Sequence, residues 1–532
     1  MIKRVVFKVK SYEALLAENE ALKACLEKQD NKIKLLEALN RHYLEMFKLH
    51  QRQKFGASSE KGNENQIMLD EVFSEMFNEA ETLKEPIMVE PTEETVIPKH
   101  TRKKAKRGSK FDKLPVETIT YELTDEEKVC DTCGNKLTEM KKEIRKELVI
   151  IPAQVKVVEH VTVSYSCRTC DKEGTAGFIK QAKSPKALIA KSLVSPSLMA
   201  YILNQKYTNA MPLYRQEQEF KRLGIGLTRQ NLSSWTLKAA TLLKPLEALI
   251  KNELLNNEIL HADETTLEVL HEPGKEATSK SYIWCYRTSH ATNHPVILYD
   301  YQKGRGAIYI QEYLKNWKGK YLHCDGYQAY KKLENVTLCG CLVHAKRKFY
   351  EAYKANELNQ DAKKGEEFIQ KLFMIEHMAD KDNFSYEERL CLRQEKSQKI
   401  FDDMYKFIDE ITPKTLPKSL LGGAIKYALN QKEYLGSFLK DGRIQLSNNL
   451  AEQSIKPFVI GRKNWLFSNT PSGASASSTI YSIIQTALAN NLKPFYYLEY
   501  VFTQIQLDKN VPMEKLLPWS EKIPNQCKNE LK

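Results

Sequence analysis

The chain lacks any apolar run that approaches the roughly 20 residues needed to span a bilayer. Its N-terminus, Met-Ile-Lys-Arg-Val-Val-Phe-Lys, also lacks the long apolar segment and the small-residue cleavage site of a secretion signal. We therefore expect no membrane partner and a cytoplasmic location. In that reducing compartment the 11 Cys are expected to be thiols or metal ligands before they are disulfides.

Acidic residues are in deficit, with 68 Asp and Glu against 81 Lys and Arg, which gives a formal net charge of +13. Such a surplus favours a polyanionic partner, with nucleic acid first and an anionic membrane surface second. Apolar residues are not scarce, at 42% hydrophobic and 9% aromatic, so the chain can build a core. At 532 residues it exceeds one typical domain, and three or four units are expected.

Glycine and proline are absent from Tyr12 to about His50, where the pattern is helical. A heptad frame places mostly apolar residues at its core positions, and an Asn at an a position favours a defined register and a dimer. The a positions are Tyr12, Asn19, Leu26, Ile33, Asn40 and Phe47, and the d positions are Leu15, Leu22, Gln29, Leu36, Tyr43 and His50. We predict a coiled coil within residues 1–55 and a homo-oligomer, at least a dimer. An amphipathic helix docked on its own domain is the alternative.

Residues 56–112 are predicted to be a linker that contains a basic run. From Lys99 to Lys110, Lys and Arg predominate and no acid occurs. Blocks of one sign are usually disordered and suit phosphate contacts. A solvated linker is the alternative, and the two interpretations are compatible. The candidate DNA contacts in this run are Lys103, Lys104 and Arg107.

Two Cys-x-x-Cys knuckles lie within residues 113–180, and they consist of Cys130, Cys133, Cys167 and Cys170. Each tight turn aims two thiolates at one ion, so the pair matches one tetrahedral, structural Zn²⁺. The stretch between the knuckles is strand-rich and predicts a small β module. A redox pair explains one knuckle but explains two poorly. The other seven Cys are scattered or lie in apolar runs and are predicted to fill space: Cys25, Cys285, Cys324, Cys339, Cys341, Cys391 and Cys527.

Residues 181–257 are predicted to be helical, with turns at Ser195-Pro196 and Gly224-Ile-Gly226. After the second turn, Thr228 is placed to cap a helix that carries Arg229. This arrangement resembles a helix-turn-helix, whose second helix can enter a major groove, so Arg229 is a candidate DNA contact. An ordinary pair of core helices explains the spacing equally well.

The periodicity changes to that of strands at 259–270, 281–288, 295–301, 320–325 and 336–343. The first three runs are expected to form an antiparallel meander, followed by a helix from about Ala307 to Trp317 and further strands. This order is that of a ribonuclease-H-like α/β core, with a first part at 258–349 and a second part at 441–490. A helical insertion is predicted at 350–440, with Pro413 and Pro417 as breaks, and a C-terminal region at 491–532. The fold class is therefore multidomain α+β.

Three carboxylates stand out against this frame. Asp263 and Asp325 lie on strand-like runs, and Glu452 lies at the start of a predicted helix. Three such acids in one pocket cannot all be charged and unpaired. Two hard divalent ions, Mg²⁺ or Mn²⁺, would resolve the repulsion and could serve a phosphodiester substrate.

Each of these acids also admits a different role. Glu452 could simply close a capping box that begins at Asn449, and Asp263 and Asp325 could be polar strand ends. His261 and His323 each precede an acid by two residues and share its face on a strand, so a mixed His/Asp hydrolase site is a competitor.

Basic residues interleave with aromatic ones beside Glu452. Lys456 lies one helical turn after Glu452, and Pro457 is expected to end the helix there. Basic side chains next to an acidic pocket suit a bound DNA end, although surface solvation explains each of them equally well. The candidate DNA contacts are Lys456, Arg462, Lys463, Trp465, Lys346, Arg347 and Lys348.

Several of these segments resemble the insertion-sequence-66 family of bacterial transposases. They include His-Ala-Asp-Glu-Thr, Cys-Asp-Gly-Tyr-Gln-Ala-Tyr, Asn-Asn-Leu-Ala-Glu-Gln-Ser-Ile-Lys-Pro and Gly-Arg-Lys-Asn-Trp-Leu-Phe. The paired knuckles and the closing Leu-Leu-Pro-Trp are similar as well, and the resemblance runs from about residue 10 to 520. Lys456 stands where the family more often has Arg. Lysine keeps the positive charge but loses the bidentate phosphate contact that Arg can make.

The resemblance implies an Asp-Asp-Glu transposase whose triad is Asp263, Asp325 and Glu452, with two Mg²⁺ or Mn²⁺ ions. It implies cleavage of double-stranded DNA at the ends of the element, and attack of the freed 3′-hydroxyl on target DNA. A location at the bacterial nucleoid is expected, and such elements usually encode small accessory proteins. A nuclease or resolvase of the same fold without strand transfer is the alternative enzyme. A DNA-binding regulator with a decayed catalytic core is the alternative from another class.

Overall fold

The computed structural model describes residues 185–529, the short stretches 155–162, 164–166 and 179–181, and scattered positions between 19 and 43. The chain divides into two compact units, Met1–Asp70 with Pro185–Lys532, and Glu71–Ser184. In the second unit, strands β1 (Ser164–Ser166) and β2 (Ile179–Gln181) pair antiparallel. Several predicted site residues lie outside the described residues: Cys130, Cys133, Cys167, Cys170, Lys103, Lys104 and Arg107.

The larger unit is built on a five-stranded mixed sheet with the order β5-β4-β3-β6-β7. Strands β3 (Ile259–Glu268), β4 (Lys280–Thr288) and β5 (Ile297–Gln302) form the predicted antiparallel meander. After helix α7 (Ala307–Tyr313) the chain returns to pair β6 (Tyr321–His323) parallel to β3. Strand β7 (Thr337–Cys339) then pairs parallel to β6. The fold is therefore mixed α+β, as predicted.

The edge of this sheet at β5 is covered by helix α15 (Pro471–Ala489). The Ser482 hydroxyl accepts the Tyr299 amide at 2.8 Å, and Thr486 both accepts from and donates to the backbone of Ile297. A bare edge strand leaves its N–H and C=O groups open to other chains. Side chains of α15 satisfy these groups here, which explains why small hydroxyl residues occur in a buried helix.

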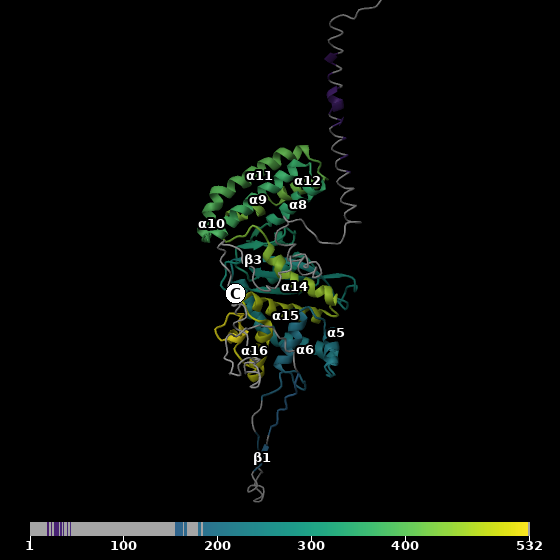
Figure 1. Ribbon diagram of the computed structural model, residues 1–532, viewed down its shortest axis with the longest axis vertical. Helices are drawn as coiled ribbons and strands as arrows, with labels where there is room; N and C mark the ends of the chain where they lie inside the picture. Colours follow the sequence, from purple (N-terminus) through teal and green to yellow (C-terminus); the bar gives the residue numbers. More distant parts are fainter. Residues whose placement is uncertain are drawn as a thin grey trace, which may run out of the picture. The chain divides into compact units, whose positions relative to one another are not determined.

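The predicted helices that precede the sheet are α4 (Pro196–Tyr207), α5 (Leu213–Arg222) and α6 (Arg229–Leu255). Thr228 caps α6 as predicted, because its hydroxyl accepts the Asn231 amide at 3.3 Å. One face of α6 is buried through Leu232, Trp235 and Ala239, so this helix is part of the main core. Figure 1 shows α5, α6, α15 and α16 (Pro494–Leu507) on the side of the sheet opposite the inserted helices.

The predicted helical insertion packs around a second hydrophobic core, which includes Phe349, Ile369 and Ile408 and extends to Ile259 and Tyr321 of the sheet. It groups helices α8 (Leu342–Ala355), α9 (Gln360–Lys381), α10 (Tyr386–Leu392), α11 (Gln398–Ile411) and α12 (Leu420–Asn430), as Figure 1 shows. The short helix α13 (Lys432–Leu435) follows α12. A π-helical turn, η3 (Arg393–Ser397), joins α10 to α11, and a 3₁₀ turn, η4 (Thr412–Lys414), contains Pro413. The remaining 3₁₀ turns are η2 (Tyr330–Lys332), η5 (Ser437–Leu439), η6 (Met513–Leu516) and η7 (Asn525–Cys527).

Helix α14 (Asn449–Trp465) corrects one prediction, because it continues through Pro457 instead of ending there. A proline inside a helix removes one N–H donor and crowds the preceding turn. The surrounding contacts compensate: the Tyr299 hydroxyl donates to the Ser454 carbonyl, and Phe458 packs in an aromatic cluster with Tyr481. Tertiary packing thus outweighs the local signal.

The described residues between 19 and 43 are helical, in agreement with the predicted N-terminal helix. The apolar residues among them that were assigned to heptad core positions are exposed to solvent: Leu26, Ile33, Leu36 and Tyr43. Among the helices that the structure describes, none has both the length and the apolar character required to cross a membrane.

Candidate active site

Asp263 lies in the middle of β3, opposite Cys285 of β4. Its carboxylate accepts the backbone amide of Glu264 at 2.9 Å. Burial, together with the negative charges of Glu264, Glu452 and Asp325, raises the pKa of Asp263 well above its usual range. A buried carboxylate with three acidic neighbours is electrostatically frustrated unless a cation joins it.

Asp325 follows β6 and begins a turn. Its carboxylate accepts the Tyr327 amide at 2.9 Å, and Gly326 adopts φ +88°, a conformation that favours glycine. The Arg305 guanidinium approaches the carboxylate at 4.0 Å, and the Tyr427 hydroxyl donates to the Asp325 carbonyl at 3.5 Å. The turn is thereby held between the loop after β5 and helix α12 of the insertion.

Glu452 lies in the first turn of α14, and its side chain is 15% exposed. The capping box considered for it does not form: the N-cap is Asn448, and no side chain caps this helix. The Oε1 atom of Glu452 is buried and has no hydrogen-bond partner among the described residues. Buried polar atoms are rarely left unpaired without a functional reason.

Asn448 joins α14 to β3. Its side-chain amide donates to the Ala262 carbonyl at 2.9 Å, and its Oδ1 lies 3.1 Å from Nδ1 of His261. Ala262 precedes Asp263, and Asn448 precedes α14 by one residue. These bonds therefore fix the start of the helix that carries Glu452 against the strand that carries Asp263.

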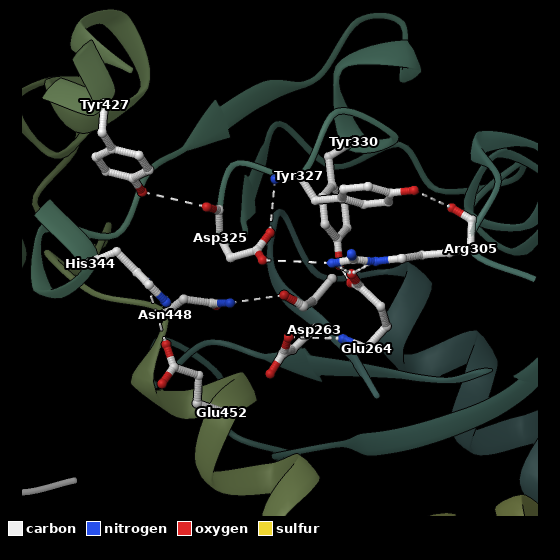
Figure 2. Close-up of polar contacts among 11 residues, drawn as sticks. Asp263, Glu264, Arg305, Asp325, Tyr327, Tyr330, His344, Tyr427, Asn448 and Glu452 are labelled. Carbon is white, nitrogen blue, oxygen red and sulfur yellow. Dashed lines mark hydrogen bonds and ion pairs between the residues drawn. The ribbon is translucent and has the colours of Figure 1, made fainter. Parts of the chain in front are cut away.

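The three carboxylates come from β3, the turn after β6 and α14, and in Figure 2 they point toward one region. The effect of Glu452 and Asp325 on the pKa of Asp263 agrees with this closeness. Carboxylate oxygens are the ligands that Mg²⁺ and Mn²⁺ prefer. The buried, unpaired oxygen of Glu452 and the raised pKa of Asp263 both fit a site built for cations.

Glu264, next in sequence to Asp263, has a different environment. Its carboxylate accepts from Nε of Arg305 at 2.6 Å and from the Tyr330 hydroxyl, and its side chain is 1% exposed. Arg305 also stacks on the Tyr327 ring at 3.7 Å. Glu264 is thus paired, and through Arg305 it supports the turn of Asp325 (Figure 2).

His261 and His323 are fully buried and stack on one another, with ring centroids 4.5 Å apart and planes within 6°. Burial lowers the pKa of His261 well below its usual range and that of His323 to about 3, so both rings are neutral. Rings that are closed to solvent cannot reach a substrate, which disfavours the mixed His/Asp hydrolase alternative.

The predicted DNA contacts divide into two groups. Four are held within the fold: Lys456 is 7% exposed, Arg462 donates to the Thr265 hydroxyl at 3.1 Å, Trp465 packs on Tyr481, and Lys346 bonds Gln370 of α9. The other four described candidates are exposed: Arg229, Arg347, Lys348 and Lys463. Lys348 lies over the ring of Tyr427, whose hydroxyl bonds Asp325, so it is close to the acids.

Sequence reasoning missed Arg305 and Asn448. Arg305 lies between Gly304 and Gly306 in a loop, a spacing that indicates a close backbone approach but does not identify the partner. Asn448 could be recognised only as a residue just before a predicted helix.

Comparison with known proteins gives consistent matches along the chain. The model described as the transposase IS66 family matches residues 191–476, and the zinc-finger binding domain of transposase IS66 matches residues 127–171. Residues 42–119 match the transposase C of IS166 homeodomain, and residues 482–519 match the IS66 C-terminal element. The uncharacterized protein y4qI of Sinorhizobium fredii is 32% identical over 436 residues, which is 79% of this chain and 78% of y4qI. The uncharacterized protein y4hP of the same organism is 29% identical over 445 residues, with the same coverage.

Proposed function

The chain belongs to the IS66 family of transposases, and we propose that it cleaves DNA at the ends of an insertion sequence and joins the freed 3′-hydroxyl to target DNA. The observation that carries this proposal is the convergence of Asp263, Asp325 and Glu452 from three separate elements. The strand order β5-β4-β3-β6-β7, with a meander before the parallel strands, supports a ribonuclease-H-like core for this chemistry.

In the proposed mechanism Asp263, Asp325 and Glu452 would hold two Mg²⁺ or Mn²⁺ ions. Ions bound there would supply activation of the attacking hydroxyl and stabilisation of the leaving oxygen of a phosphodiester. The chain's own residues position the acids: Asn448 sets Glu452 against β3, while Arg305 and Tyr427 hold the turn of Asp325. No covalent intermediate with the enzyme is required.

DNA binding follows from the family and from the net charge of +13. The proposed contacts near the acids are the exposed Arg347 and Lys348, with Lys463 near the end of α14 and Arg229 at the start of α6 as further contacts. Lys456, Arg462, Trp465 and Lys346 are better explained as structural, since each is buried or bonded within the fold. The basic run with Lys103, Lys104 and Arg107 is proposed to add phosphate contacts.

The N-terminal part is proposed to supply assembly and end recognition. The exposure of Leu26, Ile33, Leu36 and Tyr43 on a helix supports a coiled coil, because a partner helix would bury them. The match to a zinc-finger domain at residues 127–171 supports one structural Zn²⁺ held by Cys130, Cys133, Cys167 and Cys170. Helices α5 and α6 are a candidate DNA-binding region. Small accessory proteins of the element are further proposed partners.

The test is an in vitro assay on candidate end sequences, with Mg²⁺ and Mn²⁺ supplied separately. We expect nicking at the ends by the wild-type chain and none by Asp263→Asn, Asp325→Asn or Glu452→Gln. Glu351→Gln is a matched control, since Glu351 is an exposed acid on α8. Unchanged nicking by any of the three site variants would refute the assignment.

Pre-cut ends separate the alternatives. Joined products from pre-cut ends support a transposase, whereas nicking without joining supports a nuclease or resolvase of the same fold. Binding to ends with neither activity, in both Mg²⁺ and Mn²⁺, supports a decayed DNA-binding regulator.

A further inference from the structure

A second set of potential metal ligands shares Glu452. Cys341 immediately precedes α8, His344 lies in the first turn of α8, and Glu452 lies in the first turn of α14. One ligand atom from each residue lies within 4.8 Å of the other two. The starts of two helices thus bring a thiol, an imidazole and a carboxylate to one point, and Figure 2 shows the imidazole directed toward the carboxylate.

The separation of His344 and Glu452 suits a shared ion better than a direct bond. Nδ1 of His344 and Oε1 of Glu452 lie 3.8 Å apart, and both atoms are buried without a hydrogen-bond partner among the described residues. Tetrahedral zinc has bonds of about 2.0–2.3 Å, which separate two ligand atoms by about 3.3–3.8 Å. An ion between these atoms would satisfy both with little movement.

Cys341 has the surroundings that a metal-bound thiolate needs. Burial and the charge of Glu452 raise the pKa of its thiol to about 11, while the backbone amides of Asn448, His344 and Val343 act in the opposite direction. The Asn448 amide donates to Sγ at 3.3 Å. Amide donors at a helix start stabilise a thiolate, and a bound ion would complete that stabilisation as the thiol proton is released.

We propose that Cys341, His344 and Glu452 bind a borderline divalent ion such as Zn²⁺, and that this ion withdraws Glu452 from the catalytic site and inhibits DNA cleavage. A thiolate and an imidazole select Zn²⁺, Co²⁺ or Cd²⁺ over Mg²⁺, so this site differs in chemistry from the three-acid site. The inhibitory part rests on the proposed function, whereas ion binding does not.

Binding is tested with Co²⁺ on the full chain after dialysis against a chelator that empties the proposed three-ligand site and leaves the four-cysteine zinc site loaded. We expect the wild-type chain to bind one Co²⁺ more than Cys341→Ala, with a cobalt–thiolate charge-transfer band that Cys341→Ala lacks. Cys339→Ala, which removes another buried thiol, is the matched control and keeps the band. His344→Gln should weaken binding at least about tenfold. Cys341→Ser replaces Cys341→Ala if the alanine variant does not fold.

Equal stoichiometry and equal spectra for the wild-type chain and Cys341→Ala would overturn the site, whether or not the protein cleaves DNA. Inhibition is tested separately by adding Zn²⁺ to the Mg²⁺-supported cleavage reaction, each variant being compared with its own rate without zinc. We expect Cys341→Ala to need at least about tenfold more zinc for half inhibition. Equal sensitivity would overturn the inhibitory role. Loss of all cleavage in the wild-type chain would refute the proposed function and leave the Co²⁺ result intact.

Discussion

Two regions of this protein bury carboxylates. In one the carboxylate is paired with arginines, and in the other it is not. In the helical insertion, the Glu376 carboxylate accepts hydrogen bonds from Arg393 at 2.7 Å and from Arg389 at 2.9 Å. Arg393 also donates to the carbonyls of Phe438 and Asp441. Among the three acids of the candidate active site, Asp263 has acidic neighbours and a raised pKa, and Glu452 has an unpaired oxygen.

The difference separates structural from functional burial. A buried ion pair that is also bonded to neighbouring carbonyls holds elements together, although it need not add stability over an apolar substitute. Acids that are buried together without cations raise the free energy of the metal-free fold, and such frustration persists where a ligand relieves it. The paired Glu376 thus holds the helices of the insertion together, whereas the three-acid site is suited to bind cations.

The largest expected effect is on catalysis. Asp263→Asn should reduce DNA cleavage by roughly 10³-fold or more, about 4 kcal/mol of transition-state stabilisation, because one ligand of the proposed ions is lost. Its thermal stability without metal should stay the same or rise, since a repelling charge is removed. Single-turnover cleavage and a melting curve measure the two effects. If Asp263→Asn loses activity only because it unfolds, the proposed difference between the three-acid site and the insertion is contradicted.

Removal of the paired carboxylate of Glu376 should lower the stability of the fold, in contrast to removal of the Asp263 carboxylate. Glu376→Gln leaves Arg393 buried without its counter-charge and should cost about 3 kcal/mol of unfolding free energy. Glu367→Gln, an exposed acid on the same helix, is the control and should change stability by less than about 0.5 kcal/mol. Urea unfolding measures both. A stable Glu376→Gln variant would remove the distinction between the two regions.

A divalent metal ion should stabilise the fold by binding at the three-acid site, and this effect should not depend on the paired Glu376. The folded pKa of Asp263 is raised above its ordinary value of 3.8, so its contribution to stability is lost as pH rises through the folded pKa. Mg²⁺ binds the charged form, and at 100 times its dissociation constant it adds about 2.7 kcal/mol. The Mg²⁺-induced rise in melting temperature should therefore grow from pH 5 to pH 8 in wild type and in Glu376→Gln. It should be absent in Asp263→Asn, and an equal rise there would place the ion elsewhere.

Asp300 on β5 provides a smaller, intermediate case. Burial raises its pKa to about 6, although Gln302 donates to it at 2.7 Å and Lys251 lowers that pKa. Since the folded pKa is raised, stability falls as pH rises through about 6. Asp300→Asn should therefore stabilise the fold by about 2 kcal/mol more at pH 8 than at pH 4.5. Melting curves at both pH values check this, and a gain independent of pH would contradict it.

The strands of the sheet were predictable because their signal is local. β-branched runs bounded by glycine gave the five strands of the larger unit within a few residues, and Thr228 and Pro413 marked helix boundaries as expected. Helix α14 was not predictable at Pro457, since the contacts that hold it there come from Tyr299 and Tyr481, distant in sequence.

The site was only partly accessible from the residues alone. Spacing drew attention to Asp263 and Asp325, but the approach of Glu452 depends on Asn448 reaching Ala262, which no local pattern reveals. The family resemblance favoured a catalytic role for Glu452 over the capping-box alternative. The direction of the side chains could not be predicted from the sequence either. Lys456 and Trp465 belong to a basic and aromatic stretch, yet both point into the fold.

The attachment of α14 to β3 at two separate points has a mechanical consequence. Asn448 joins the helix to the strand near Asp263, and Arg462 joins them again at Thr265 and Thr266. Asn448 and Arg462 thereby fix Glu452 relative to Asp263. Asp325 lies instead on a turn that Arg305 contacts from the loop after β5 and Tyr427 contacts from the insertion. A displacement of the insertion would therefore reach Asp325 directly, through Tyr427.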